Sequence, residues 1–255
     1  MDRNHTLIIS TWLHDIQWQD GWKAMQEDAR IRQPSVWVID PNRFFRRLPI
    51  HGEQLLSSDE IAKAVRFYQT DHALRFKAAH TALRLLLGYT TTSNPAALQF
   101  EKVHHNKPRL ETPANTGIQF NLSYTENRAM IGVDSGQPIG IDIEWSQRPL
   151  DIETMLAACF SANEIAFICA QKGELRQRFF TLWTRKEAIL KLTGEGIGDH
   201  LPHFEVLDGV HRAKKQVIGG QPPDNVYLYS FSVEEGFIGC FASPIPVSQC
   251  LFYRL

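Results

Sequence analysis

Two stretches of this chain repeat one order of elements, and this repetition constrains the fold more than any other feature of the sequence. From 71 to 87, apolar residues recur at helical spacing, and Gly88 is the expected end of the helix. From 174 to 192, a second helical segment precedes Gly194. The matching pairs are Arg75-Phe76 with Phe100-Glu101 in the first stretch and Arg178-Phe179 with Phe204-Glu205 in the second. Strand-like sequence follows in both, so we expect an α+β fold made of two similar α/β subdomains in tandem.

Short runs of β-type sequence predict the strands. They cover 36–39, 118–122, 129–133 and 139–145, and a turn at 134–138 joins the last two. We place the boundary between the subdomains at this turn, so that the first covers 35–136 and the second covers 137–255. Residues 1–34, with three tryptophans and a polar, helix-like stretch, are expected to form an N-terminal extension that packs on the main body.

The composition is that of a globular protein without a strong overall field. The chain is 43% hydrophobic and 22% charged, and 27 Lys and Arg against 28 Asp and Glu give a formal net charge of -1. This balance argues against a nucleic-acid or anionic membrane partner. The sequence has no apolar run near the roughly 18 residues that span a bilayer, and its start lacks the pattern of a secretory signal. The four cysteines lack C-x-x-C spacing and lie in mostly apolar sequence, so we expect buried reduced thiols and a cytoplasmic protein.

Asp142 and Glu144 lie two residues apart in the predicted strand 139–145, so their side chains share one face. This spacing separates the two positions by roughly 6 to 7 Å. Their carboxylates can converge on one hard cation, whereas without a cation two close acids repel each other and a pKa rises. A solvent-facing acidic edge is the alternative interpretation of the pair.

Glu187 lies on an otherwise apolar stripe of the second predicted helix. Helical spacing aligns it with Phe180, Trp183 and Leu190. A carboxylate is unusual on such a stripe. It either pairs with Lys191 one turn later, as an ordinary surface ion pair, or serves as a third metal ligand with Lys191 beside a phosphate.

These two patterns together resemble the signature of a known family. Gly-Ile-Asp-Ile-Glu at 140–144, followed by Trp-x-x-Lys-Glu-Ala-x-x-Lys at 183–191, resembles the paired motif of the 4'-phosphopantetheinyl transferase superfamily, in its larger, surfactin-type (Sfp-like) branch. Further motifs follow in family order: Phe67-Tyr68 with Arg75 and Arg84, Asn106-Lys107-Pro108, Phe120-Asn121-Leu122-Ser123, Phe160-Ser161-x-x-Glu164 and Gly194-Glu195-Gly196. The resemblance implies two α/β halves related by a pseudo-two-fold, each a long helix packed on a small, mostly antiparallel sheet, with the active site between them.

The resemblance also implies a role for each matching residue. The second subdomain would carry the ligands of Mg2+, which are Asp142, Glu144 and Glu187. Lys191 would neutralise the pyrophosphate of coenzyme A. The phosphates of the 3',5'-ADP part would be held by Lys63, Arg75, Lys107 and Ser123. Glu164 matches the glutamate proposed in the family as a general base, a role that Lys186 or a water molecule on the metal could share.

Tyr124 departs from the family pattern, which usually has Ser-His where this chain has Ser123-Tyr124. In the family, that histidine contacts the 3'-phosphate of the coenzyme. Tyrosine donates one hydrogen bond but brings no positive charge. We therefore expect weaker discrimination between coenzyme A and its 3'-dephosphorylated form.

The implied function is Mg2+-dependent transfer of 4'-phosphopantetheine from coenzyme A to a serine hydroxyl of an apo-acyl or peptidyl carrier protein, with release of 3',5'-ADP. Because two halves of one chain would complete the site, a monomer is expected. Two other classes stay open at this point. One is a non-catalytic module that binds coenzyme A or a carrier protein, which Tyr124 makes conceivable. The other is a metal-dependent hydrolase of phosphate esters, which would act without a carrier.

Overall fold

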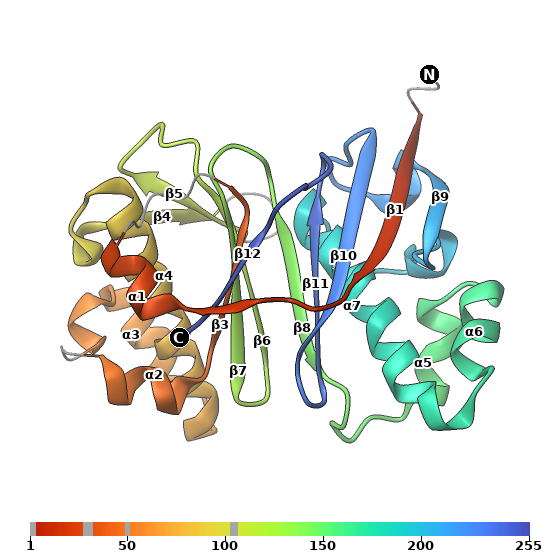
Figure 1. Ribbon diagram of the computed structural model, residues 1–255, viewed down its shortest axis with the longest axis horizontal. Coiled ribbons are helices and arrows are strands. Elements are labelled where there is room, and N and C mark those ends of the chain that lie inside the picture. The colour runs from red at the N-terminus through yellow and green to blue at the C-terminus, as the bar shows by residue number, and fades with distance from the viewer. Residues whose placement is uncertain (1–3, 28–32, 49–51, 103–106) are drawn as a thin grey trace. The chain divides into compact units, whose positions relative to one another are not determined.

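The computed structural model describes residues 4–27, 33–48, 52–102 and 107–255 of the chain (Figure 1). They form two compact units, each of which combines helices with a sheet. The C-terminal unit comprises Met1–Ile16, His104–Lys107 and Gln137–Ser248, and the N-terminal unit comprises Gln17–Val103, Pro108–Gly136 and Gln249–Leu255.

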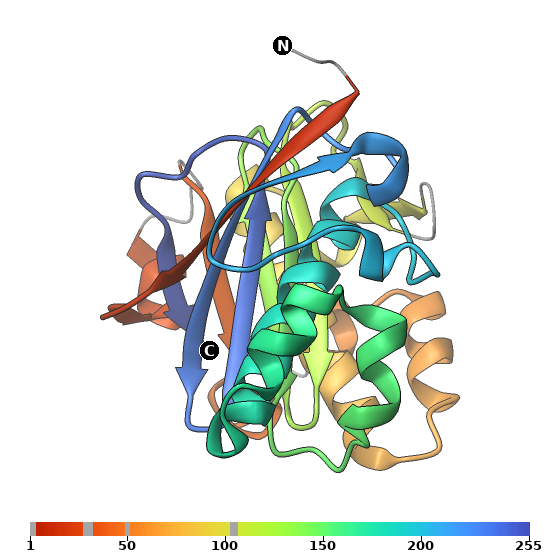
Figure 2. The same ribbon diagram turned by 90° about the vertical axis from the view of Figure 1, so that its right-hand side faces the viewer.

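The C-terminal unit is a five-stranded sheet covered by one long helix. Its strands lie in the order β8 (Gly140–Trp145), β11 (Phe237–Ser243), β10 (Asn225–Glu234), β1 (His5–Leu13) and β9 (Gly209–Lys214). Strand β1 pairs with β10 in parallel, and the other neighbours pair antiparallel. Helix α7 (Leu175–Thr193) packs on β8, β10 and β11, and Figure 2 shows it in teal against these strands. The other helices of this unit are α5 (Ile152–Cys159), α6 (Ala162–Cys169) and α8 (Lys215–Ile218), with 3₁₀ turns at Lys172–Glu174 and Leu201–His203.

The N-terminal unit repeats this plan with a second five-stranded sheet. Its strands lie in the order β2 (Trp18–Asp20), β12 (Leu251–Arg254), β3 (Ser35–Ile39), β7 (Arg128–Asp134) and β6 (Gln119–Thr125). A separate hairpin pairs β4 (Gln99–Lys102) with β5 (Pro108–Thr112). Helix α4 (Thr70–Thr91) packs on β7 and β3. The other helices are α1 (Gly21–Glu27), α2 (Pro41–Arg47) and α3 (Ser58–Val65), with 3₁₀ turns at Gly52–Leu55 and Pro95–Ala97.

The tandem organisation expected from the sequence is confirmed by the strand order. In the N-terminal unit β3, β7 and β6 are neighbours in that order, and in the C-terminal unit β8, β11 and β10 are. Both trios are antiparallel throughout. Parallel pairing enters where the terminal strands join, since β12 lies parallel to both β2 and β3.

The two ends of the chain depart most from the expected division. Residues 1–34 are not one appended segment, because β1 is an inner strand of the C-terminal sheet while β2 belongs to the N-terminal sheet. In the same way β12, near the end of the chain, lies inside the N-terminal sheet. The turn at 134–138 does coincide with a boundary between the units. Parallel pairing of segments far apart in sequence leaves no hairpin signal, which explains why the sequence did not indicate it.

Helix α4 continues past Gly88, where the sequence predicted its end. Its last residue is Thr91, and Thr92 adopts the left-handed conformation that caps it, with φ of 53°. A side chain at Gly88 would meet Pro95, because a Cβ there would lie 2.7 Å from the Pro95 ring. Gly88 thus marks a close approach of the following loop to the helix. The second helix ends as expected at Gly194, whose φ is 75°.

Two further expectations concern the membrane and the cysteines. Among the described residues, no helix has both the length and the apolar character to cross a membrane. All four cysteines are free, and Cys159 and Cys240 are buried as expected. Cys169 is exposed and Cys250 is half-buried, so burial holds for only part of the set.

Candidate active site

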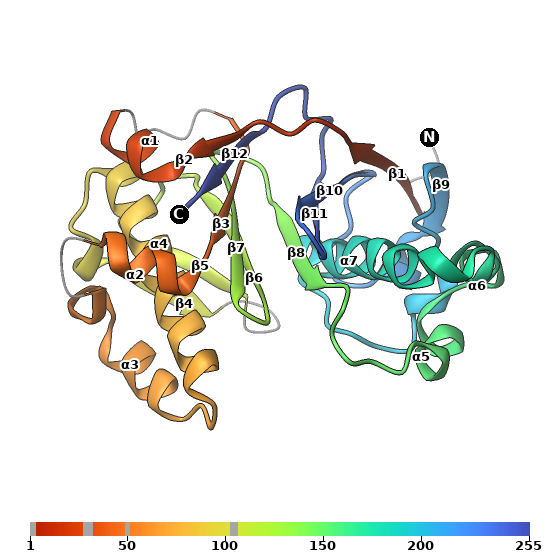
Figure 3. The ribbon, with the colours of Figure 1, turned by 60° about the horizontal axis from the view of Figure 1, so that its bottom comes forward.

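The candidate site is built on β8 and on the face of α7 that packs against it (Figure 3). Gly140 makes this packing possible. A Cβ at this position would lie 2.0 Å from the Ala188 carbonyl oxygen and 2.5 Å from the Leu192 backbone nitrogen. The helix backbone therefore rests directly on the first residue of the strand, which places Asp142 and Glu144 beside the helix between Trp183 and Lys191.

Asp142 and Glu144 are buried rather than displayed on an exposed edge. Asp142 is 4% exposed and Glu144 is 9% exposed, so the alternative of a solvent-facing acidic edge is wrong. Lys191 of α7 donates from Nζ to Asp142 Oδ1 over 2.7 Å. Trp183 Nε1 donates to Glu144 Oε1 over 3.2 Å. The motif on the strand and the motif on the helix are thus in direct contact.

Arg148 is a member of this cluster that sequence reasoning missed. Its guanidinium lies 3.5 Å from Glu144 Oε1 and stacks over the ring of Phe180 at 5.4 Å. The signal in the sequence was the spacing, since Arg148 follows Glu144 by four residues just after the strand. The indole of Trp183 was expected to serve as an apolar member of the stripe, yet it also supplies a hydrogen-bond donor.

Glu187 occupies the apolar stripe of α7 as the helical phase predicted. Phe180, Trp183 and Leu190 are all buried, and Glu187 is half-buried among them. Within the described part of the chain, its buried Oε1 has no hydrogen-bond partner. Burial first, and then the negative charge of Asp142, raise the pKa of Glu187 to about 7. The ordinary surface pair with Lys191 is therefore a poor description of this carboxylate.

The carboxylate oxygens at this site are suitable ligands for a divalent cation that prefers oxygen. Three carboxylates from one strand and one helix offer hard oxygen ligands, and the unpartnered Glu187 oxygen is the atom that a cation would satisfy. As they stand, no three acidic, His or Cys side chains in the described ranges already take up a metal-binding arrangement. One of the three carboxylates, that of Asp142, is instead paired with the Lys191 ammonium. The three carboxylates are of the ligand type that the metal prefers, and their side chains would have to turn toward it to bind it.

Glu164 and Lys186 form a buried ion pair instead of an accessible acid–base pair. Both residues are 0% exposed, and Lys186 Nζ lies 2.9 Å from Glu164 Oε2. Glu164 also accepts hydrogen bonds from the backbone nitrogens of Ser161 and Val206, each over 2.9 Å. These contacts saturate the carboxylate and cap α6. A role for Glu164 or Lys186 in taking a proton from the acceptor serine stays a prediction, and it would require these buried groups to become accessible.

The basic residues expected at the coenzyme phosphates differ in their surroundings. Lys107 donates to the Lys191 carbonyl over 2.7 Å, at the end of α7, and burial lowers the pKa of its ammonium to about 8. Lys63 is exposed on α3, with Nζ 5.0 Å from the centre of the Phe76 ring. Arg75 is half-buried on α4 and donates to the Glu126 carbonyl. Lys107 belongs to the C-terminal unit and the other two to the N-terminal unit.

Ser123 and Tyr124 are neighbours on β6 and therefore point to opposite faces. Ser123 is 3% exposed, whereas Tyr124 is 36% exposed. The tyrosine is thus the more accessible of the two side chains. Asn106 of the expected Asn-Lys-Pro motif lies outside the described residues.

Comparison with known proteins adds to this geometry. The profile of the 4'-phosphopantetheinyl transferase superfamily matches residues 138–241. The chain is 39% identical over 176 residues to the 4'-phosphopantetheinyl transferase HetI of Nostoc sp., an alignment that covers 65% of this chain and 74% of the relative. It is 31% identical to a putative 4'-phosphopantetheinyl transferase of Synechocystis sp., covering 74% and 75%. It is 27% identical to the 4'-phosphopantetheinyl transferase Sfp of Bacillus subtilis, covering 71% and 79%.

Proposed function

This chain belongs to the 4'-phosphopantetheinyl transferase superfamily and is an enzyme of that class, and from this premise we propose how its residues carry out the transfer. The substrate is coenzyme A and the acceptor is a serine hydroxyl of an apo-acyl or peptidyl carrier protein. The serine oxygen bonds to the phosphorus that carries pantetheine, while the bond from that phosphorus to the 3',5'-ADP oxygen breaks. The serine proton leaves to water.

Asp142, Glu144 and Glu187 are assigned to Mg2+. When bound, this ion supplies positive charge against the pyrophosphate and the leaving oxygen. The observation that carries the assignment is the Glu187 carboxylate, whose buried Oε1 has no hydrogen-bond partner among the described residues, on an apolar helix face beside the buried acids Asp142 and Glu144. Burying such a charge costs free energy unless a counter-charge meets it. Trp183 and Arg148 orient Glu144 through their contacts with its Oε1.

Lys191 is assigned to the coenzyme pyrophosphate. Its ammonium now pairs with Asp142, and it would be available to a phosphate oxygen if the acids held Mg2+. Lys63, Arg75, Lys107, Ser123 and Tyr124 are assigned to the phosphates of the 3',5'-ADP part. The buried ion pair of Glu164 and Lys186 holds α6 against α7.

The enzyme is proposed to be a cytoplasmic monomer with no nucleic-acid or membrane partner. The near-neutral charge of the chain supports the proposed absence of a nucleic-acid or membrane partner. The carrier protein and coenzyme A are then its only required partners.

Replacing Tyr124 with histidine should sharpen recognition of the 3'-phosphate. Histidine adds a donor that can carry positive charge, so we expect the preference in kcat/KM for coenzyme A over 3'-dephospho-coenzyme A to rise on the order of tenfold. Steady-state kinetics with both substrates measure it. Tyr89→His, which adds the same group on the exposed side of α4, should leave the preference unchanged. An equal preference before and after Tyr124→His would remove Tyr124 from the phosphate site.

The proposal is tested by calorimetric titration of coenzyme A into the protein with and without Mg2+. We expect Mg2+ to tighten coenzyme A binding, and we expect the gain to vanish in Asp142→Asn. Binding that is equal with Mg2+ and with a chelator would refute the metal assignment.

A further inference from the structure

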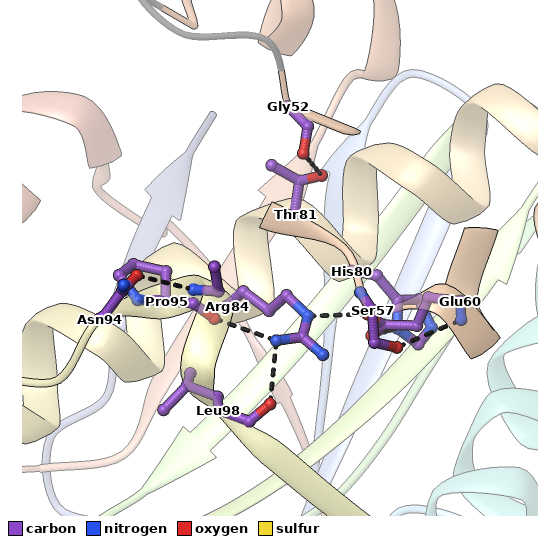
Figure 4. Close-up of polar contacts among 10 residues, drawn as sticks. Gly52, Ser57, Glu60, His80, Thr81, Arg84, Asn94, Pro95 and Leu98 are labelled. Atoms are coloured by element: carbon purple, nitrogen blue, oxygen red, sulfur yellow. Dashed lines mark hydrogen bonds and ion pairs between the residues drawn. The ribbon is translucent and has the colours of Figure 1, made fainter. Parts of the chain in front are cut away.

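Glu60 is the centre of a half-buried polar cluster to which no function has yet been assigned (Figure 4). Its Oε2 accepts from the Ser57 backbone nitrogen over 2.8 Å and from Arg84 Nε over 2.7 Å. Its Oε1 lies 2.8 Å from His80 Nδ1. Burial raises the pKa of this carboxyl, but the bonds from His80 and Ser57 and the charge of Arg84 outweigh it and lower the pKa to about 2. Glu60 is therefore ionised and joins α3 to α4.

Arg84 places the positive charge of this cluster deep in the N-terminal unit. It is 1% exposed. Its Nη1 donates to the carbonyls of Pro95 and Leu98, each over 3.0 Å, and its guanidinium lies 5.1 Å from the centre of the Phe100 ring. A charge this deeply buried depends on its counter-charge, so Glu60 and Arg84 fix each other. Figure 4 shows Arg84 spanning from Glu60 on one side to these carbonyls on the other.

The cluster reaches Lys63 by two routes. Glu60 and Lys63 are three residues apart on α3, which makes them neighbours on one side of the helix. His80 lies on the Phe76 ring with centroids 4.0 Å apart, and the Lys63 ammonium lies over that same ring at 5.0 Å. Arg75 precedes Phe76 on α4. The groups around Glu60 thus support the two cations of this unit that we assign to the coenzyme phosphates.

The C-terminal unit contains a similar arrangement, in which a capping glutamate pairs with a buried cation on the long helix. Ser161 and Glu164 form the same reciprocal cap at the start of α6 that Ser57 and Glu60 form at the start of α3. Glu164 pairs with Lys186 of the long helix, and Lys186 donates to two carbonyls of the following loop. In that unit, helix α7, which the Glu164–Lys186 pair joins to α6, carries Glu187 and Lys191. The same contacts recur in both units on the helix that carries the proposed phosphate-binding or metal-binding groups.

We propose that Glu60, with His80 and Arg84, is a positioning group that holds Lys63 on α3 and Arg75 on α4 in place for the phosphates of the 3',5'-ADP part of coenzyme A. The inference rests on the proposed function, because it needs those two cations to bind the coenzyme. A held cation binds phosphate without first losing side-chain and helix freedom. We call the contacts of Glu60 with His80 and Arg84 the clamp. Its loss should weaken coenzyme binding and leave the transfer step itself intact.

The test compares Glu60→Gln with Thr81→Val by titration with 3',5'-ADP. Gln keeps the shape of Glu60 but removes the charge that holds Arg84. Thr81 is buried on the same helix, and its hydroxyl donates to the Gly52 carbonyl over 3.3 Å, apart from the Glu60 contacts (Figure 4). Thr81→Val is thus a matched control that destabilises the unit without touching the clamp. Thermal denaturation of both variants separates stability from binding.

For Glu60→Gln we expect the Kd for 3',5'-ADP to rise on the order of tenfold, the size of one lost charge-assisted contact. The KM for coenzyme A should rise with it, while kcat and the KM for the carrier stay within about twofold. Thr81→Val should lower Tm without changing the Kd. An unchanged Kd in folded Glu60→Gln would overturn the inference. If the unaltered protein itself fails to bind 3',5'-ADP, the phosphate assignments of the proposed function fail instead.

A second variant decides the question if Glu60→Gln does not fold. His80→Phe keeps an aromatic ring on Phe76 and leaves the Glu60–Arg84 pair intact, but removes the bond to Glu60 Oε1. We expect its Kd for 3',5'-ADP to rise about threefold, because one of the two routes to Lys63 is lost. A Kd equal to that of the unaltered protein would overturn the inference.

Discussion

Replacing Glu187 with glutamine should reduce Mg2+-dependent loading of a carrier protein on the order of a thousandfold or more, because one charged ligand of the proposed metal is lost. Asp142→Asn should do the same. Glu153→Gln, which neutralises an exposed acid on α5, should load the carrier at the normal rate. The rate is measured as carrier loaded per minute over a range of Mg2+ concentrations. Full loading by both Glu187→Gln and Asp142→Asn would remove these residues from the metal site.

Glu187→Gln should also stabilise the metal-free protein. The pKa of Glu187 is raised in the folded state, so the folded protein holds this proton more tightly than the unfolded chain does. Stability from this group is present at low pH and is lost as pH rises from the ordinary value of 4.5 to about 7. At pH 8 without metal, Glu187→Gln should therefore gain on the order of 1 kcal/mol in the free energy of unfolding. Urea denaturation with a chelator present measures it, and a loss of stability would contradict the description of Glu187 as an acid whose buried oxygen has no partner.

Gly140→Ala should cost about 3 kcal/mol or more in the free energy of unfolding, because overpacking here forces backbone to move. The added methyl group would lie 2.0 Å from the Ala188 carbonyl oxygen, and a backbone atom cannot turn aside as a flexible side chain can. Helix α7 would have to lift from β8, which separates Glu187 and Lys191 from Asp142. We therefore expect a lower Tm and loss of loading together.

Gly136→Ala is the matched control for this change. Gly136 lies in the turn before β8, and a Cβ there would have nothing within 4 Å. Its Tm and loading rate should stay near those of the unaltered protein. Equal stability of Gly140→Ala and Gly136→Ala would show that α7 and β8 do not pack as closely as described.

Local periodicity predicted the main site elements from the sequence. The alternation of β8 places Asp142 and Glu144 on one side, and the phase of α7 places Glu187 on the buried stripe with Phe180 and Trp183. These patterns depend only on residues close in sequence, which is why they were readable. The burial of both acids was not, because it arises from the packing of α7 on the strand at Gly140.

Features that depend on distant residues escaped prediction. The first strand pairs in parallel with β10, and β12 joins the N-terminal sheet, so neither end of the chain forms a separate extension. The burial of Glu164 escaped prediction for the same reason. Its capping motif is local and visible in the sequence, but its ion-pair partner Lys186 lies on the distant helix α7. The motif predicted Lys186 as a site residue. In the structure, its ammonium donates hydrogen bonds to the carbonyls of Leu201 and Phe204.

The most direct test is the mass of an apo-carrier protein after incubation with this protein, coenzyme A and Mg2+. We predict that the carrier gains the mass of one 4'-phosphopantetheine group on its serine, that an equal amount of 3',5'-ADP is released, and that a chelator prevents both. An unchanged carrier mass, with folded protein that binds coenzyme A, would contradict transferase activity and favour a binding module. Release of phosphate products without a gain in carrier mass would instead indicate a hydrolase.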